Sequence, residues 1–153
     1  MLRFRVSTWA CASFLALLSF VATPAQAQVR PGVQAGVSID PDQFYFGGHL
    51  QTAPLAENVR FRPGVDIGIG SDLMLVAVNL DFTYTFANRR PWNLYVGGGP
   101  AINWYNPDGG GSDTESGFNF LVGARTRTGL FFEMKVGAMD SPDLKFGVGY
   151  TFR

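Results

Sequence analysis

Hydrophobic and polar residues alternate with a period of two along most of the chain after residue 28. The clearest stretch is 59–69, where Val, Phe, Pro and Ile at odd positions alternate with Arg, Gly and Asp at even positions. Because successive side chains of a strand point to opposite faces, this period predicts strands with two different surfaces. No stretch with helical periodicity competes. We expect eight strands, which cover residues 29–39, 43–51, 59–69, 74–86, 92–104, 118–124, 130–138 and 144–152.

The connections between these strands are short. Asp-containing turns alternate along the chain with turns of other composition, and the longest connection, 105–116, contains a Gly-Gly-Gly run. Strands of about 9–11 residues joined in this way predict an up-and-down antiparallel meander. The Asp-containing turns lie at 40–42, 71–72 and 140–143, and the others at 52–58, 87–91 and 126–129.

The two faces of the predicted strands differ in size. One face is large and aromatic, whereas the other is small, rich in Gly and carries scattered charges. Glycine weakens a strand unless a tight space requires it, and the interior of a narrow barrel is such a space. The pattern therefore predicts an all-β, eight-stranded antiparallel up-and-down transmembrane β-barrel with its large apolar side chains facing lipid. Aromatic residues near the strand ends should form two girdles, one with Tyr84, Phe86, Trp92, Phe132 and Tyr150 and the other with Phe44, Trp104, Phe118 and Phe146.

Composition agrees with this class. The chain has 153 residues, of which 46% are hydrophobic, 14% aromatic and only 16% charged, with 19 Gly. Soluble domains carry about 25% charged residues and about 7% Gly. An average hydrophobic fraction excludes a disordered chain and a helical membrane bundle. A formal net charge of zero also argues against a nucleic-acid partner, which would require a basic surface.

The first 27 residues have the three parts of a secretory signal peptide. Arg3 and Arg5 begin it, residues 10–22 are apolar, and Ala25-Gln26-Ala27 forms a cleavage site. The alternative, a short membrane anchor, is disfavoured because the apolar stretch is too short to cross about 30 Å of hydrocarbon. We expect two regions, the signal peptide at 1–27 and the barrel at 28–153. The only cysteine, Cys11, would leave with the signal peptide.

Two segments resemble the OmpA/OmpX-type family of small outer-membrane β-barrel proteins. They are Leu94-Tyr95-Val96-Gly97-Gly98-Gly99-Pro100-Ala101-Ile102 and Phe146-Gly147-Val148-Gly149-Tyr150-Thr151-Phe152, which accompany the signal peptide and the eight alternating strands. The resemblance implies a monomer in the outer membrane of a Gram-negative-type bacterium, in contact with lipid and lipopolysaccharide. It also implies that both termini lie in the periplasm. Family members usually end on an aromatic residue that the barrel-assembly machinery reads. Here Phe152 and Tyr150 would form that signal, with Arg153 following.

With this topology the Asp-containing connections would lie outside the cell, and they carry no basic residue. Such loops would attract divalent cations among lipopolysaccharide phosphates. Asp108, Asp113 and Glu115 in the longest connection form a candidate divalent-cation loop. The alternatives are that the acidic loops only aid solubility and that this loop is a flexible linker.

Charged residues also face the predicted lumen. Buried charges need partners, because an unpaired one costs several kcal/mol. We expect a salt-bridged plug, in which the three inward acids pair with inward bases. The alternative is a narrow water-filled path that favours anions, because inward bases outnumber inward acids. The predicted lumen charge network is Arg60, Arg62, Asp66, Asp81, Arg125, Glu133 and Lys135. Arg30, Lys145 and Arg153 also point inward, and Arg30, Arg60, Arg62, Arg125 and Arg153 should gather at the periplasmic end.

The sequence contains no constellation typical of an enzyme, a metal centre or a cofactor site. His49 is the only histidine, and strand parity points it into the lumen, where it would form hydrogen bonds. We therefore expect a structural or surface-interaction protein. A narrow channel for ions or small solutes and a secreted lipocalin-like binder are the alternatives. Pro63 and Pro100 fall inside predicted strands, where proline removes a ladder hydrogen bond. Either local bulges absorb the two prolines or those strands break and the number of strands falls.

Overall fold

The computed structural model describes residues 29–86 and 91–153. The predicted signal peptide at 1–27 and most of the predicted turn at 87–91 lie outside the described residues. Among the described residues, no helix is long and apolar enough to cross a membrane. The strands are β1 (Arg30–Ile39), β2 (Gln43–Gln51), β3 (Pro54–Ala56), β4 (Val59–Ile69), β5 (Leu73–Thr85), β6 (Trp92–Pro107), β7 (Asp113–Thr126), β8 (Leu130–Met139) and β9 (Leu144–Thr151).

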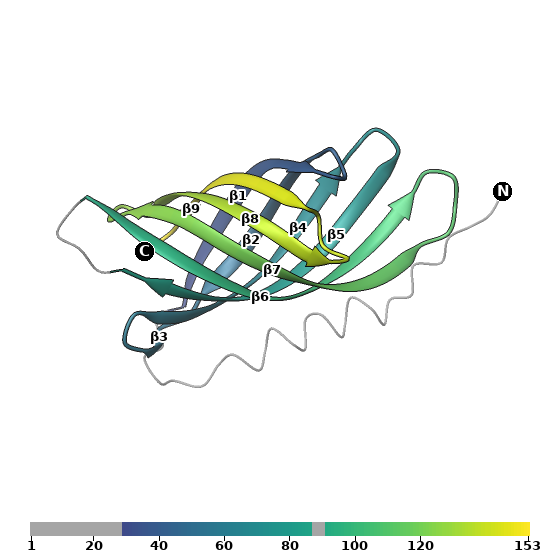
Figure 1. The fold of residues 1–153 in the computed structure, drawn as a ribbon. Helices are drawn as coiled ribbons and strands as arrows, with labels where there is room; N and C mark the ends of the chain where they lie inside the picture. Colours follow the sequence, from purple (N-terminus) through teal and green to yellow (C-terminus); the bar gives the residue numbers. More distant parts are fainter. Residues whose placement is uncertain (1–28, 87–90) are drawn as a thin grey trace, which may run out of the picture.

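Eight of these strands close into an antiparallel barrel (Figure 1). The strands of the sheet follow the order β2-β1-β9-β8-β7-β6-β5-β4, and the pairing of β2 with β4 joins its two edges and closes the barrel. The predicted eight-stranded up-and-down barrel is thereby confirmed. The turn predicted over 52–58 is wrong in one detail, since it contains the short strand β3, in which Pro54 pairs with Arg60 and Ala56 with Val59.

Neither proline produces a bulge or breaks its strand. Pro63 pairs in register with Leu80 of β5, and Pro100 pairs with Phe118 of β7. On the other side of Pro100 the β5–β6 ladder stops at Asn79↔Ala101 and resumes at Phe82↔Gly98 with the register unchanged. A missing donor thus interrupts the ladder for a short distance without shifting it, and both strands stay continuous.

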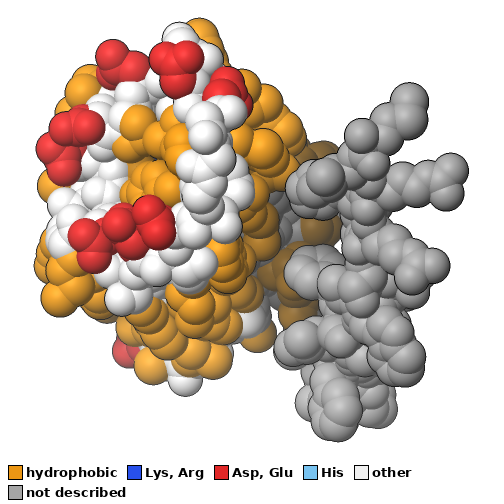
Figure 2. All heavy atoms as spheres, turned by 90° about the vertical axis from the view of Figure 1, so that its right-hand side faces the viewer, with side chains coloured by type: hydrophobic (Ala, Val, Ile, Leu, Met, Phe, Trp, Pro, Cys, Tyr) orange, Lys and Arg blue, Asp and Glu red, His pale blue; other side chains and the backbone are white. Residues whose placement is uncertain are grey.

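The barrel has an inverted distribution of polarity. Among the residues that the structure describes, sixteen buried side chains are polar or charged and seven are hydrophobic, whereas twenty-seven large hydrophobic side chains are exposed. Figure 2 shows apolar side chains around the wall of the barrel. A soluble protein has the opposite distribution, because its apolar side chains gather in the core. Continuous apolar surface of this extent marks contact with a membrane or a partner.

Some side chains that fill the interior are larger than the small inward face of the predicted strands suggests. Tyr95 and Phe131 point into the lumen and are 0% and 1% exposed. Each lies against a glycine, because a Cβ atom at Gly123 would overlap the Tyr95 ring and one at Gly149 would overlap the Phe131 ring. Gly123 is the cross-strand partner of Tyr95, and Gly149 is that of Phe131. The inward glycines therefore make room for large rings and do not leave the lumen open.

This arrangement predicts that Gly123→Val destabilises the barrel. The new side chain would meet the Tyr95 ring and the Phe132 carbonyl oxygen. Overpacking of this kind costs about 1–3 kcal/mol. Urea unfolding of the refolded barrel measures the loss. Gly109→Val is the matched control, since nothing lies within 4 Å of a Cβ atom there. Equal stability of the two variants would contradict this account of the interior.

The two ends of the barrel differ in charge. The terminal end, where β1 begins and β9 ends, also holds the connections at 52–58 and 127–129. The opposite end, which we call the acidic end, holds the connections 40–42, 70–72, 108–112 and 140–143. Figure 2 shows this end with acidic side chains around its rim and no basic side chain in view. The acidic residues at or next to these connections are Asp40, Asp42, Asp72, Asp108, Asp113, Glu115, Asp140 and Asp143.

Candidate functional site

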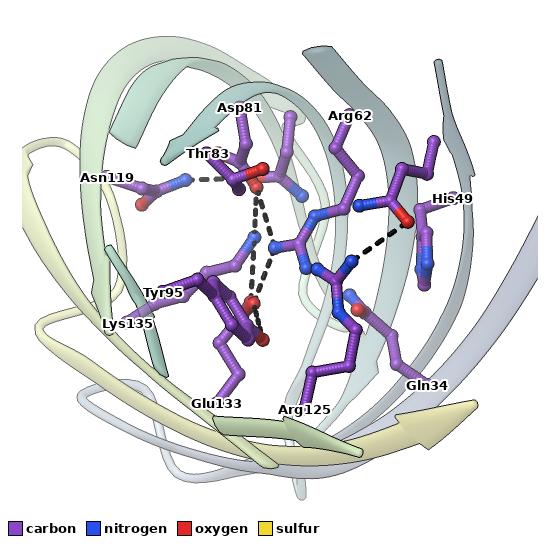
Figure 3. A network of polar contacts seen from close by, with 12 residues as sticks. Gln34, His49, Arg62, Asp81, Thr83, Tyr95, Asn119, Arg125, Glu133 and Lys135 are labelled. Atoms are coloured by element: carbon purple, nitrogen blue, oxygen red, sulfur yellow. Dashed lines mark hydrogen bonds and ion pairs between the residues drawn. The ribbon is translucent and has the colours of Figure 1, made fainter. Parts of the chain in front are cut away.

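Four charged side chains from three strands form a buried cluster inside the lumen (Figure 3). Arg62 Nη2 on β4 donates a hydrogen bond of 2.6 Å to Glu133 Oε2 on β8 and lies 3.5 Å from Asp81 Oδ2 on β5. Lys135 Nζ donates to Asp81 Oδ2 at 2.7 Å and lies 3.8 Å from Glu133 Oε1. Each carboxylate therefore faces two cations, and each cation faces two carboxylates.

Aromatic rings complete the surroundings of this cluster. The Tyr95 hydroxyl on β6 donates a hydrogen bond of 2.7 Å to Glu133 Oε2. The Arg62 guanidinium carbon lies 5.8 Å from the centroids of both the Tyr95 and the Phe131 rings. A cation within about 6 Å of an aromatic face is attracted by the ring quadrupole. The rings thus contact the arginine while excluding water from the ion pairs.

Asp66 on β4 organises a second buried cluster. Lys145 Nζ on β9 donates to Asp66 Oδ2 at 3.0 Å, and Gln34 Nε2 on β1 donates to Asp66 Oδ1 at 2.6 Å. Asn79 Nδ2 donates to Asp66 Oδ2 at 3.0 Å and its own Oδ1 atom accepts a hydrogen bond of 2.8 Å from Asn119 Nδ2. The Lys145 ammonium also lies 4.3 Å from the centroid of the Tyr45 ring on β2. The carboxylate is thereby well supplied with donors.

We call these two clusters the lumen plug. It contains three cations and three anions, so its formal charge is zero. Every strand of the closed barrel contributes to it, and the gap between Tyr45, Asp66 and Lys145 leaves no volume for a water molecule. Its members are Gln34, Tyr45, Arg62, Asp66, Asn79, Asp81, Tyr95, Asn119, Glu133, Lys135 and Lys145.

The structure assembles the predicted charge network only in part. Arg62, Asp66, Asp81, Glu133 and Lys135 all lie in the lumen plug. Arg60 and Arg125 do not, and the expectation that they pair with the inward acids is wrong. Arg60 Nη1 instead donates to the Thr52 carbonyl oxygen, and Arg125 Nη1 donates to Gln51 Oε1. The physical reason is their position along the barrel axis. Both arginines lie on their strands close to the terminal end, whereas the inward acids lie further into the lumen.

Lys145 is the charged member of the lumen plug that the predicted network omits, although strand parity places it on the inner face. Arg62 differs from the prediction in its position. The sequence predicts that it lies at the periplasmic end with the other arginines, whereas its guanidinium reaches Glu133 on β8 and so belongs to the lumen plug. His49 lies in the lumen as predicted, 5% exposed, with Nε2 at 3.1 Å from Thr151 Oγ1.

The three acidic residues of the candidate divalent-cation loop do not converge. Asp113 and Glu115 are held in β7 by pairing with Tyr105 and Asn103 of β6, which keeps them about 7 Å apart along the strand. Asp108 lies in the turn beyond β6, where its backbone N–H donates to the Asp72 carbonyl oxygen. In the part of the chain that the structure describes, no three His, Cys, Asp or Glu side chains are placed to hold a metal ion.

The aromatic residues at the end of β9 point outward. Tyr150 and Phe152 are 39% and 46% exposed, and their ring centroids lie 5.3 Å apart. The Phe152 backbone N–H donates a hydrogen bond of 2.8 Å to the Pro31 carbonyl oxygen, which ties the last residues to β1. Both rings are accessible from outside the barrel, and their role as an assembly signal stays a prediction.

Comparisons with known proteins support the fold. No protein-family model matches the chain, and no curated protein matches its sequence. Among solved structures, the chain is similar to the crystal structure of Neisserial surface protein A (NspA), with a TM-score of 0.63. The two share 14% sequence identity, and the alignment covers 81% of this chain and 94% of that chain. At this identity the likeness concerns the barrel fold alone.

Proposed function

We propose that this protein is an integral outer-membrane barrel with a closed lumen and a structural or surface-interaction role. The observation that carries the proposal is the inverted polarity of the barrel. An apolar wall that encloses charged and polar side chains is stable in lipid and unfavourable in water. A secreted lipocalin-like binder would instead enclose apolar side chains and present a polar wall.

Two further features support a membrane-spanning barrel. Strands of about 9–11 residues suffice to cross a bilayer when tilted, and the barrel strands have 8–16 residues. Outward aromatic rings meet in pairs near the terminal end, with centroids 5.1 Å apart in Tyr84 and Phe86 and 5.8 Å apart in Trp92 and Phe132. Such rings are typical of the interface between lipid and water.

The likeness to NspA, which is named as a surface protein, and the family resemblance favour the outer membrane and periplasmic termini for this chain. The acidic end would then face outward. Its connections carry carboxylates without a basic residue, which suits contacts with cationic groups or with cations bound among lipopolysaccharide phosphates. The barrel would act as the anchor that presents this end, and no catalytic step is part of the proposal.

Planar-bilayer recording tests the closed lumen. We expect no stable openings from the purified protein, because the lumen plug crosses the lumen between opposite strands. Insertion is checked in the same preparation by protease protection and by heat-modifiable migration on gels. Stable unitary openings of the wild-type barrel would contradict the closed lumen and favour the alternative of a narrow channel for ions or small solutes.

A further inference from the structure

A polar hollow opens at the terminal end of the barrel, separate from the lumen plug. Its volume is about 390 Å³. Five arginines contribute to its wall, and amide or hydroxyl side chains fill most of the remainder. The arginines are Arg30, Arg60, Arg125, Arg127 and Arg153, and Gln51 is one of the amides. We call this hollow the arginine pocket.

No Asp or Glu side chain neutralises these arginines. Every Asp and Glu of the chain falls within the described ranges, and none lies within 4.0 Å of the five guanidinium groups. The three inward acids are already occupied by Arg62, Lys135 and Lys145 in the plug. The surplus of inward bases over acids is therefore concentrated in one place.

Two of the guanidinium groups are held in position by neutral partners. Arg60 Nη1 donates to the Thr52 carbonyl oxygen at 3.1 Å, and Arg125 Nη1 donates to Gln51 Oε1 at 2.9 Å. The Arg125 guanidinium carbon also lies 4.9 Å from the centroid of the Tyr95 ring. A guanidinium has five N–H donors, so most of the donors of both groups remain free for a ligand.

Further buried polar atoms beside these arginines have no protein partner. Gln51 is only 2% exposed, and its Nε2 atom has no hydrogen-bond acceptor. The Arg125 Nε atom is likewise buried without an acceptor. A buried donor without an acceptor is costly, and native structures rarely leave one. Both donors belong to side chains that line the arginine pocket, so the polar groups around the pocket are not fully paired within the protein.

We propose that the arginine pocket binds a small oxyanion of the phosphate type with more than one negative charge. Planar guanidinium groups match phosphate oxygens with paired N–H donors, which a single ammonium cannot do. The pocket volume lies at the small end of the range for ligand sites and fits a group the size of a diphosphate. The same chemistry occurs in free phosphates and in phospholipid headgroups.

Titration with inorganic pyrophosphate tests the proposal. The full chain is expressed, and the barrel is extracted and purified in a phosphate-free, non-ionic detergent. Isothermal titration calorimetry should then detect binding by the wild type. Arg60→Gln and Arg125→Gln should each weaken it by about ten-fold or more, as expected for loss of a charge-assisted hydrogen bond. Arg60→Lys and Arg125→Lys keep the charge but lose the fork, so they should also bind more weakly than wild type.

Glu57→Gln is the matched control, because it changes the charge of a turn at the same end without altering the pocket lining. It should bind as well as wild type. Heat-modifiable migration verifies that each variant is folded. A second arm measures retention of phosphatidylglycerol by native mass spectrometry. Retention that the Gln variants lose, without pyrophosphate binding, would assign the site to a lipid headgroup. Binding of neither probe, or equal binding by all variants, would overturn the proposal.

Discussion

Replacement of Glu133 by alanine should lower the free energy of unfolding by about 3–5 kcal/mol, the cost of breaking a buried ion pair from one side. Glu133 accepts hydrogen bonds from Arg62 and Tyr95 and lies 3.8 Å from Lys135. Its removal leaves two buried cations to share Asp81 alone. The magnitude follows from this uncompensated charge, because the pair itself need not be strongly stabilising.

Equilibrium urea unfolding in lipid vesicles, followed by tryptophan fluorescence, measures this loss. Glu133→Gln separates charge from packing, since it keeps the volume of the side chain and should recover only part of the stability. Glu57→Ala removes an exposed carboxylate from a turn and should change the stability by no more than about 0.5 kcal/mol. If Glu133→Ala matched Glu57→Ala, the plug would have no role in holding the barrel together.

Strand parity explains why the barrel could be predicted from the sequence. Odd positions of 59–69 are large and even positions are small or charged, and a shift of one residue would exchange the two faces. This signal does not depend on the turns, so the strand count is correct although β3 was missed. β3 has only three residues and pairs across a register shift, too short a stretch for periodicity to detect.

The pairing inside the lumen could not be predicted from parity. Parity places Arg62 and Glu133 on the inner face, but their contact joins β4 to β8 across 71 residues. Lys145 meets Asp66 across 79 residues. Such contacts depend on the stagger of the strands around the barrel, which sets the height of each side chain. The same stagger leaves Arg60 and Arg125 too near the terminal end to reach the inward acids.

The inward aromatic rings were predictable in principle. Tyr95 and Phe131 fall at inward positions by the same parity that places Leu94 and Phe132 outside. Their significance depends on cross-strand neighbours, because each ring requires a glycine beside it in the register. An inward glycine therefore does not by itself indicate free space in the lumen, because at Gly123 and Gly149 an aromatic ring fills the room beside it. The register of the strands, and not the composition, shows which side chain does so.

Substitution of Val122 by arginine tests the assignment of the outer wall. Val122 lies on β7, 42% exposed, between Val96 of β6 and Met134 of β8. In a bilayer an arginine near the midplane of a barrel wall costs about 2–4 kcal/mol, because its charge must leave water. Urea unfolding in phospholipid vesicles should record this loss relative to the wild type.

The matched control is Leu55→Arg, since Leu55 is 62% exposed but lies on β3 beyond the terminal end of the barrel. It should cost less than about 1 kcal/mol, as substitutions near the membrane surface do. A wall that faced water would tolerate arginine at Val122 equally well, because exposed substitutions change stability by about 0.5 kcal/mol or less. Equal effects at the two positions would therefore favour the lipocalin-like alternative, and a clear difference would require lipid around β7.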